Sequence, residues 1–168
     1  MARLPYQETT AAWAALQWAT GKLVSTNSRT KPLTVIEAPR VPGLYRMTWT
    51  GLDDWANIER TLVVKASVKV DDPKLDFSDR TPPVLLTIGR TTNIYNRLRQ
   101  HFSTNRHSNR VLSRLRQLSA LPLEDLLDLI RKNIKTEWVA VPGWIERCLL
   151  EKFGVVTEWP VLDLEAEH

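Results

Sequence analysis

Residues 84–102, VLLTIGRTTNIYNRLRQHF, contain an apolar run, a glycine and an arginine-rich segment in direct succession. The run VLLTI at 84–88 is almost continuously apolar, which is typical of a central strand that is covered on both faces. Gly89 is expected to break this strand. We therefore predict a short core strand that ends at Ile88 and leads into a helix.

The helix after the glycine is predicted from the spacing of its apolar residues. Ile94 and Leu98 lie four positions apart, and therefore on the same face of a helix that runs to about Phe102. Thr91 or Thr92 can cap its first turn. The strand, the glycine and this helix form the centre of the predicted fold.

Further strands and helices are predicted on both sides of this unit. Residues 43–49, GLYRMTW, alternate enough to form a strand, and 136–141, TEWVAV, form a third core strand. Apolar periodicity predicts helices at 8–23, 108–119, 122–133 and 144–156. The expected fold class is α/β (α+β), with a small central three-stranded, mostly antiparallel sheet flanked by helices.

The other segments are expected to surround this core. Residues 24–40 are rich in turn formers and are interpreted as a connector, 59–70 as a strand within an insertion, and 71–83 as a loop. The expected organisation is an N-terminal helix and connector arm at 1–40, a main domain at 41–163 with an insertion at 50–83, and an acidic tail at 164–168.

The composition is that of a chain with one core. The 168 residues are 43% hydrophobic, which suffices for one compact domain. Cys148 is the single cysteine, so no internal disulfide can form. No apolar run approaches the roughly 20 residues that cross a membrane, and residues 1–10 lack the apolar core of a secretory signal. We therefore expect a cytoplasmic protein that does not enter membranes.

Positive charge is concentrated in one part of the chain. The net charge is +4, yet the segment from 80 to 123 contains no Asp or Glu. Its arginines are Arg80, Arg90, Arg97, Arg99, Arg106, Arg110, Arg114 and Arg116. Because a guanidinium group binds phosphate in a forked geometry, this distribution favours a polyanionic partner. A solvated helix surface is the alternative explanation.

Arg97 and His101 are the first candidates for chemistry. They lie four residues apart and therefore on one helix face, with Asn93 one turn earlier. A guanidinium and an imidazole whose Cβ atoms are about 6 Å apart can bind a phosphate, and the imidazole can also move a proton near neutral pH. An ordinary polar surface would show the same spacing.

Four motifs occur in the order of a known set. They are GLY at 43–45, TIG at 87–89, NIYNRLRQH at 93–101 and LLEKFGVVTEWPVLD at 149–163. In this respect the chain resembles the GIY-YIG nuclease family over residues 41–49 and 84–163. The resemblance implies an active site composed of a strand tyrosine, a helix arginine, a metal-binding glutamate and a terminal polar residue.

The resemblance assigns roles to three residues of the first motifs. Tyr45 matches the tyrosine of GIY, which is proposed to deprotonate the attacking water. Since free tyrosine has a pKa near 10, this role requires cations that favour the ionised form, and Arg97 is such a cation. Arg97 matches the arginine that binds the scissile phosphate, and His101 matches a position that assists the tyrosine.

The resemblance also implies a metal-binding glutamate on the last helix. Glu146 and Glu151 both lie there, and the spacing to Pro160 and Asp163 favours Glu151. One carboxylate, phosphate oxygens and several waters are a normal set of ligands for Mg²⁺, with Mn²⁺ as a possible substitute. We therefore expect Mg²⁺ at Glu151, where it would stabilise the leaving 3′ oxygen.

Two positions differ from the family pattern. Thr87 stands where a second tyrosine is expected, and Asp163 stands where the family has asparagine. Tyr95 could supply a phenol instead, but its position two residues before Arg97 directs it to another side of the helix. These differences favour an alternative function, a nucleic-acid-binding module that kept the fold and lost the chemistry.

The expected function is a metal-dependent endonuclease that hydrolyses DNA phosphodiester bonds. Residues expected to bind the substrate beside the catalytic set are Thr87, Arg90, Asn93, Arg99, Arg106, Arg110 and Asp163. Double-stranded DNA is the expected partner, and a homodimer would let two such sites cut both strands. The insertion at 50–83 and the N-terminal arm favour a restriction-like, phage or mobile-element nuclease, which is an inference by analogy.

Overall fold

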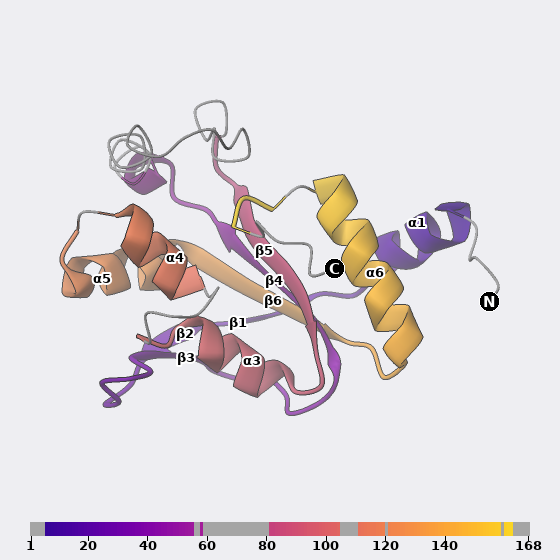
Figure 1. The fold of residues 1–168 in the computed structure, drawn as a ribbon, viewed down its shortest axis with the longest axis horizontal. Helices are drawn as coiled ribbons and strands as arrows, with labels where there is room; N and C mark the ends of the chain where they lie inside the picture. The colour runs from indigo at the N-terminus through magenta and orange to yellow at the C-terminus, as the bar shows by residue number, and fades with distance from the viewer. Residues whose placement is uncertain are drawn as a thin grey trace.

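The computed structural model describes residues 6–55, 58, 81–104, 111–119, 121–158 and 160–162. A four-stranded antiparallel sheet with the order β1-β6-β4-β5 lies at its centre (Figure 1). The strands are β1 (Ala19–Gly21), β4 (Gly43–Trp49), β5 (Val84–Thr91) and β6 (Ile134–Ala140). The predicted mixed α/β fold with an antiparallel sheet is confirmed, whereas the predicted number of three strands is too low.

The additional strand β1 also corrects the predicted helix at 8–23. The helix α1 (Tyr6–Ala14) is shorter, and the chain after it pairs with the outer edge of β6. Gly21 permits this pairing, because a Cβ atom there would lie 2.3 Å from the ring of Trp138. Backbone pairing with β6 therefore outweighs the helix-favouring alanines of this segment.

A small second sheet replaces the connector that was predicted at 24–40. It consists of β2 (Leu23–Ser25) and β3 (Leu33–Val35), which pair antiparallel. Leu23, Leu33 and Val35 are buried in the main core. Burial of these three side chains stabilises strands that are too short to show a sequence periodicity.

Strand β5 differs from its prediction in position and length. It is an edge strand, not a central one, and it continues through Gly89 to Thr91. Residues from the C-terminal part of the chain cover its outer edge. The N–H groups of Val161 and Leu162 donate to the carbonyl oxygens of Leu85 and Leu86 at 3.0 and 2.8 Å. The apolar side chains of β5 reflect burial of its faces, because Val84 and Leu86 belong to the main core and α6 contacts the strand.

Four helices follow as predicted, with shifted ends. They are α3 (Ile94–His101), α4 (Val111–Leu118), α5 (Leu123–Asn133) and α6 (Trp144–Glu158). Asn93, and neither Thr91 nor Thr92, caps α3, because its side chain accepts from the N–H of Asn96 at 2.9 Å. Ile94 and Leu98, which form the predicted apolar face of this helix, are both buried.

The sheet separates two hydrophobic clusters. Tyr45, Met47 and Trp49 alternate along β4 into the larger cluster, on the side of α3, α4 and α5. Leu44 contributes to the smaller cluster, on the side of α6 and α1 (Figure 1). This alternation confirms the strand predicted at 43–49 and directs Tyr45 toward α3.

Some sequence predictions fall outside the described residues. These are the strand at 59–70, most of the loop at 71–83 and the acidic tail at 164–168. Within the part of the chain that the structure describes, none of the helices has the length and apolar character needed to span a membrane.

Candidate active site

The first part of the candidate site is formed by Tyr45 and Gly89 on neighbouring strands. Tyr45 is paired with Gly89 of β5 and with Trp138 of β6. A Cβ atom at Gly89 would lie 2.2 Å from the Tyr45 hydroxyl oxygen and 2.5 Å from Cζ. The prediction that Gly89 ends the strand is therefore wrong. The glycine leaves the space that the Tyr45 phenol occupies.

Arg97 and His101 of α3 both contact the Tyr45 hydroxyl group. Arg97 Nε donates to Tyr45 Oη at 3.2 Å, and His101 Nε2 lies 2.8 Å from the same oxygen. The prediction that the two residues share a helix face is confirmed. Strand alternation and helix periodicity thus bring two predicted catalytic residues, Arg97 and His101, to the hydroxyl oxygen of a third, Tyr45.

A fourth group fixes the orientation of the histidine. His101 is 3% exposed, and the N–H of Val111, at the start of α4, donates to its Nδ1 at 3.4 Å. With Nδ1 as an acceptor, the proton of the neutral ring is on Nε2, which then donates to Tyr45 Oη. Donors from both Arg97 and His101 stabilise negative charge on the phenol oxygen. The contact between His101 and Val111 could not be predicted from the sequence, because it depends on how α3 and α4 pack against each other.

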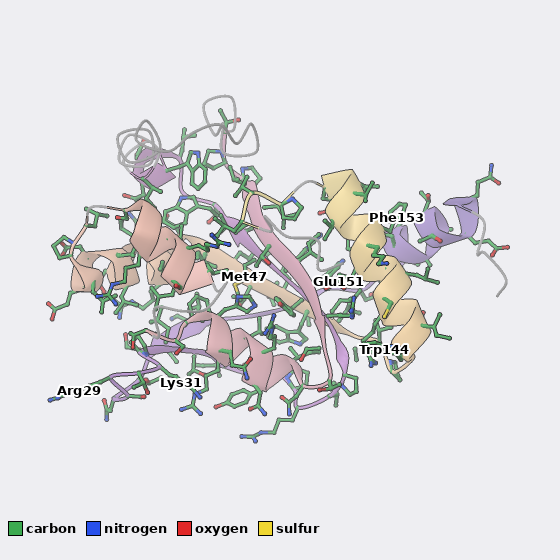
Figure 2. The ribbon with its side chains drawn as sticks, in the orientation of Figure 1. Arg29, Lys31, Met47, Trp144, Glu151 and Phe153 are labelled. Atoms are coloured by element: carbon green, nitrogen blue, oxygen red, sulfur yellow. The ribbon has the colours of Figure 1, made fainter. Side chains whose placement is uncertain are left out.

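Glu151 of α6 forms the second part of the site. Its Oε1 accepts from the backbone N–H of Arg90 at 2.9 Å, and its Oε2 accepts from the Arg90 guanidinium. Figure 2 shows Glu151 and Trp144 on the side of α6 that faces β5. Glu146 is exposed instead and lies near Gly143. Of the two glutamates considered from the sequence, the structure therefore brings Glu151 to β5.

The two parts meet at consecutive residues of β5. The Tyr45 phenol lies against Gly89, and the Glu151 carboxylate binds the N–H of Arg90. Arg90 pairs with Leu44, whose side chain belongs to the cluster beneath α6. The end of β5 thus has the Tyr45 group on one side and the Glu151 carboxylate on the other.

Trp144 contacts Arg90 of β5, and Arg147 contacts Trp144; neither was predicted as a site residue. The Arg90 Cζ atom lies 5.0 Å from the centre of the Trp144 ring, and that of Arg147 lies 5.6 Å from it. Arg147 is 4% exposed and donates to the carbonyl oxygens of Val141 and Pro142 at 2.6 and 2.7 Å. The sequence could have indicated them, because Trp144 and Arg147 precede Glu151 by seven and four residues and so lie on the same face of α6.

The remaining predicted binding residues have different positions. Thr87 is buried in β5 opposite Met47, on the side of Tyr45. The Asn93 side chain caps α3. Arg99 has a buried Nε atom for which the described residues provide no hydrogen-bond acceptor. Three further residues, Arg106, Arg110 and Asp163, lie outside the described residues.

The donor set fits a hard divalent cation that keeps most of its waters. Over the described ranges, no three His, Cys, Asp or Glu side chains come together as a metal cluster. The Glu151 side chain is 20% exposed and therefore reaches solvent. A single water-accessible carboxylate suits Mg²⁺, which loses its waters reluctantly.

Comparison of the chain with protein-family models gives no match, and comparisons with curated proteins and with solved structures give none either. The resemblance to GIY-YIG nucleases therefore stays a prediction. What can be said of function rests on the geometry around Tyr45 and Glu151.

Proposed function

We propose that the protein is a metal-dependent endonuclease of the GIY-YIG type that hydrolyses phosphodiester bonds in DNA. One observation carries the proposal: Arg97 and His101 both contact the Tyr45 oxygen against Gly89, and Glu151 binds the next residue, Arg90, on the other side of the strand end. A buried phenol with two such donors is suited to proton transfer.

Tyr45, Arg97 and His101 act together in the proposed reaction. Hydrogen bonds from the two basic residues favour the phenolate form of Tyr45. Water attacks the phosphorus atom and gives its proton to the phenolate oxygen. The bond from phosphorus to the 3′ oxygen breaks, and the leaving oxygen takes a proton from a solvent water to become a hydroxyl group. Arg97 also binds the scissile phosphate and stabilises the charge that develops on it.

Glu151 would hold the divalent cation, Mg²⁺ or Mn²⁺. Bound there, the cation supplies a Lewis acid that stabilises the leaving 3′ oxygen. The backbone N–H of Arg90 fixes one oxygen of the carboxylate, which orients Glu151 relative to β5.

The proposal is tested with supercoiled plasmid and linear duplex DNA at low salt, in Mg²⁺ and in EDTA. We expect the wild type to nick plasmid in Mg²⁺ alone, and Arg97→Ala and Glu151→Ala each to lower the rate by about 100-fold or more. Arg131→Ala is the matched control, because Arg131 is exposed and pairs with Asp128 on α5. An active Arg97→Ala variant would contradict the assignment.

A binding module without cleavage is the second candidate function. The observation that favours it is Thr87, a buried residue on the Tyr45 side of β5 whose short side chain stands where the family has a phenol. Salt-sensitive DNA binding with no cleavage by the wild type or any variant would establish this function.

A homodimer, which would present two sites to the two strands of a duplex, is also proposed. Sedimentation in the presence and absence of DNA tests it. A monomer under both conditions would contradict it.

A further inference from the structure

Arg90 lies between the Glu151 carboxylate and an exposed aromatic ring. Its guanidinium donates to Glu151 Oε2, and its Cζ atom lies 5.0 Å from the centre of the Trp144 ring. The side chains of Arg90 and Glu151 are 29% and 20% exposed, so ions from solvent can reach both. The one carboxylate that would bind the cation is therefore already neutralised by an arginine.

Arg90 holds Glu151 in two ways that can be separated. The backbone N–H binds Oε1 at 2.9 Å whatever side chain residue 90 carries. The guanidinium binds the other oxygen and brings the compensating charge. Loss of the guanidinium would thus leave the carboxylate in place and remove its counter-ion.

The guanidinium also has a second contact that does not involve Glu151. Trp144 is 57% exposed, and a cation stacked on such a ring is attracted to its π face. If the ion pair with Glu151 were broken, the Arg90 guanidinium would remain on the Trp144 ring, close to the end of β5. Its hydrogen-bond donors would then be available to a phosphate.

We propose that Arg90 and a divalent cation compete for the Glu151 carboxylate, which makes Arg90 a positioning residue for the metal site. The proposal rests on the proposed function, since it takes Glu151 as the metal ligand. Arg90 balances the negative charge of the carboxylate in the absence of the cation, and it becomes a phosphate-binding group when the cation is bound. Cation binding and DNA binding therefore strengthen each other.

The test measures Mn²⁺ binding without DNA, from the electron paramagnetic resonance signal of free Mn²⁺ in a titration. We expect Arg90→Gln to bind Mn²⁺ about 3- to 10-fold more tightly than the wild type, from the loss of a partly exposed ion pair and of repulsion between cations. Glu151→Gln should abolish this binding. Arg90→Lys, which keeps the charge but not the forked geometry, should lie between wild type and Arg90→Gln.

Lys152→Gln is the matched control for the loss of a charge near the site. Lys152 follows Glu151 in sequence, is exposed, and has no ion pair with Glu151 among the described contacts. We expect it to change Mn²⁺ affinity by less than about twofold. An equal gain in Mn²⁺ affinity in Lys152→Gln and Arg90→Gln would overturn the proposal, because the loss of any nearby positive charge would then explain it.

The remaining outcomes separate the inference from the function. If the wild type binds Mn²⁺ through Glu151 but Arg90→Gln binds it no more tightly, the competition is wrong and the metal site stands. If neither protein binds Mn²⁺, the competition is wrong as well, and the plasmid assay alone decides the function. Thermal unfolding of each variant shows whether it is folded. If Arg90→Gln does not fold, the Mn²⁺ affinity of Arg90→Lys is compared with that of the wild type instead.

Discussion

Gly89 decides at the scale of a single residue whether the site can form. We expect Gly89→Ala to displace the Tyr45 ring, because the new methyl group would lie 2.2 Å from its oxygen. Overpacking of this kind destabilises a protein by about 1 to 3 kcal/mol. Urea unfolding measures this loss, and plasmid nicking should decrease with it.

Gly143→Ala is the control for this substitution. Among the described residues, a Cβ atom at Gly143 would meet only the Glu146 side chain, at 3.2 and 3.4 Å. The far end of that chain can move, so a loss below about 1 kcal/mol is expected. Equal losses in both variants would contradict the role given to Gly89.

Tyr45→Phe separates the hydroxyl group from the ring. The variant keeps the ring over Gly89 but removes the acceptor that Arg97 and His101 share. We expect the free energy of unfolding to fall by about 1 to 3 kcal/mol, since a buried donor loses its partner, and cleavage to be lost. Unchanged cleavage would exclude the Tyr45 oxygen as the proton acceptor.

An ion-pair network connects elements on the face of the sheet opposite Tyr45. Arg46 of β4 binds Glu137 of β6 at 2.8 Å, and Glu137 also binds Lys135 at 2.8 Å. Burial raises the pKa of Glu137, but hydrogen bonds from Arg46 and Lys135 outweigh it, so this pKa lies below its usual value. The charged form is therefore stabilised by folding.

This network predicts the response of stability to acid. Because the pKa of Glu137 is lower in the folded chain, its contribution is complete above the unfolded value of about 4.3 and is lost as the pH falls through the folded value. Comparing urea unfolding at about pH 7 and about pH 3, we expect Glu137→Gln to lose less stability than the wild type, by about 1 to 3 kcal/mol. Asp128→Asn, at an exposed pair, should behave like the wild type.

The elements differ in how far the sequence could predict them. The helices at 94–101 and 123–133 have apolar residues spaced over several turns, and burial of Leu98 and Ile130 confirms them. Strands β1, β2 and β3 have three residues each and show no period, so only their partners determine them. The edge position of β5 was equally hidden, because its cover comes from residues about 75 positions later.

The site was predictable where its spacing is local. Arg97 and His101 share a face through helix geometry alone, whereas their contact with Tyr45 depends on how α3 packs on the sheet. The pairing of Arg90 with Glu151 joins two motifs that are far apart in sequence, and only the folded chain shows it. The assignment of catalytic roles remains a prediction.

At the scale of the whole molecule, the positive net charge predicts salt-dependent DNA binding. With a charge of +4 and arginines gathered between 80 and 123, several phosphates would be neutralised at once. We expect the logarithm of the affinity to fall linearly with the logarithm of salt concentration, with a slope of about −0.9 for each phosphate contact. Fluorescence anisotropy measures this slope, and a flat response would contradict a phosphate-based interface.

The cover on β5 by Val161 and Leu162 has a consequence for handling the protein. Those residues occupy carbonyl groups that an edge strand would otherwise offer to another chain. A chain that ends before Val161 would leave the outer backbone groups of this apolar strand unpaired, and such an edge is a template for self-association. Such a chain would precipitate through the same strand that has Tyr45 on one side and Glu151 on the other.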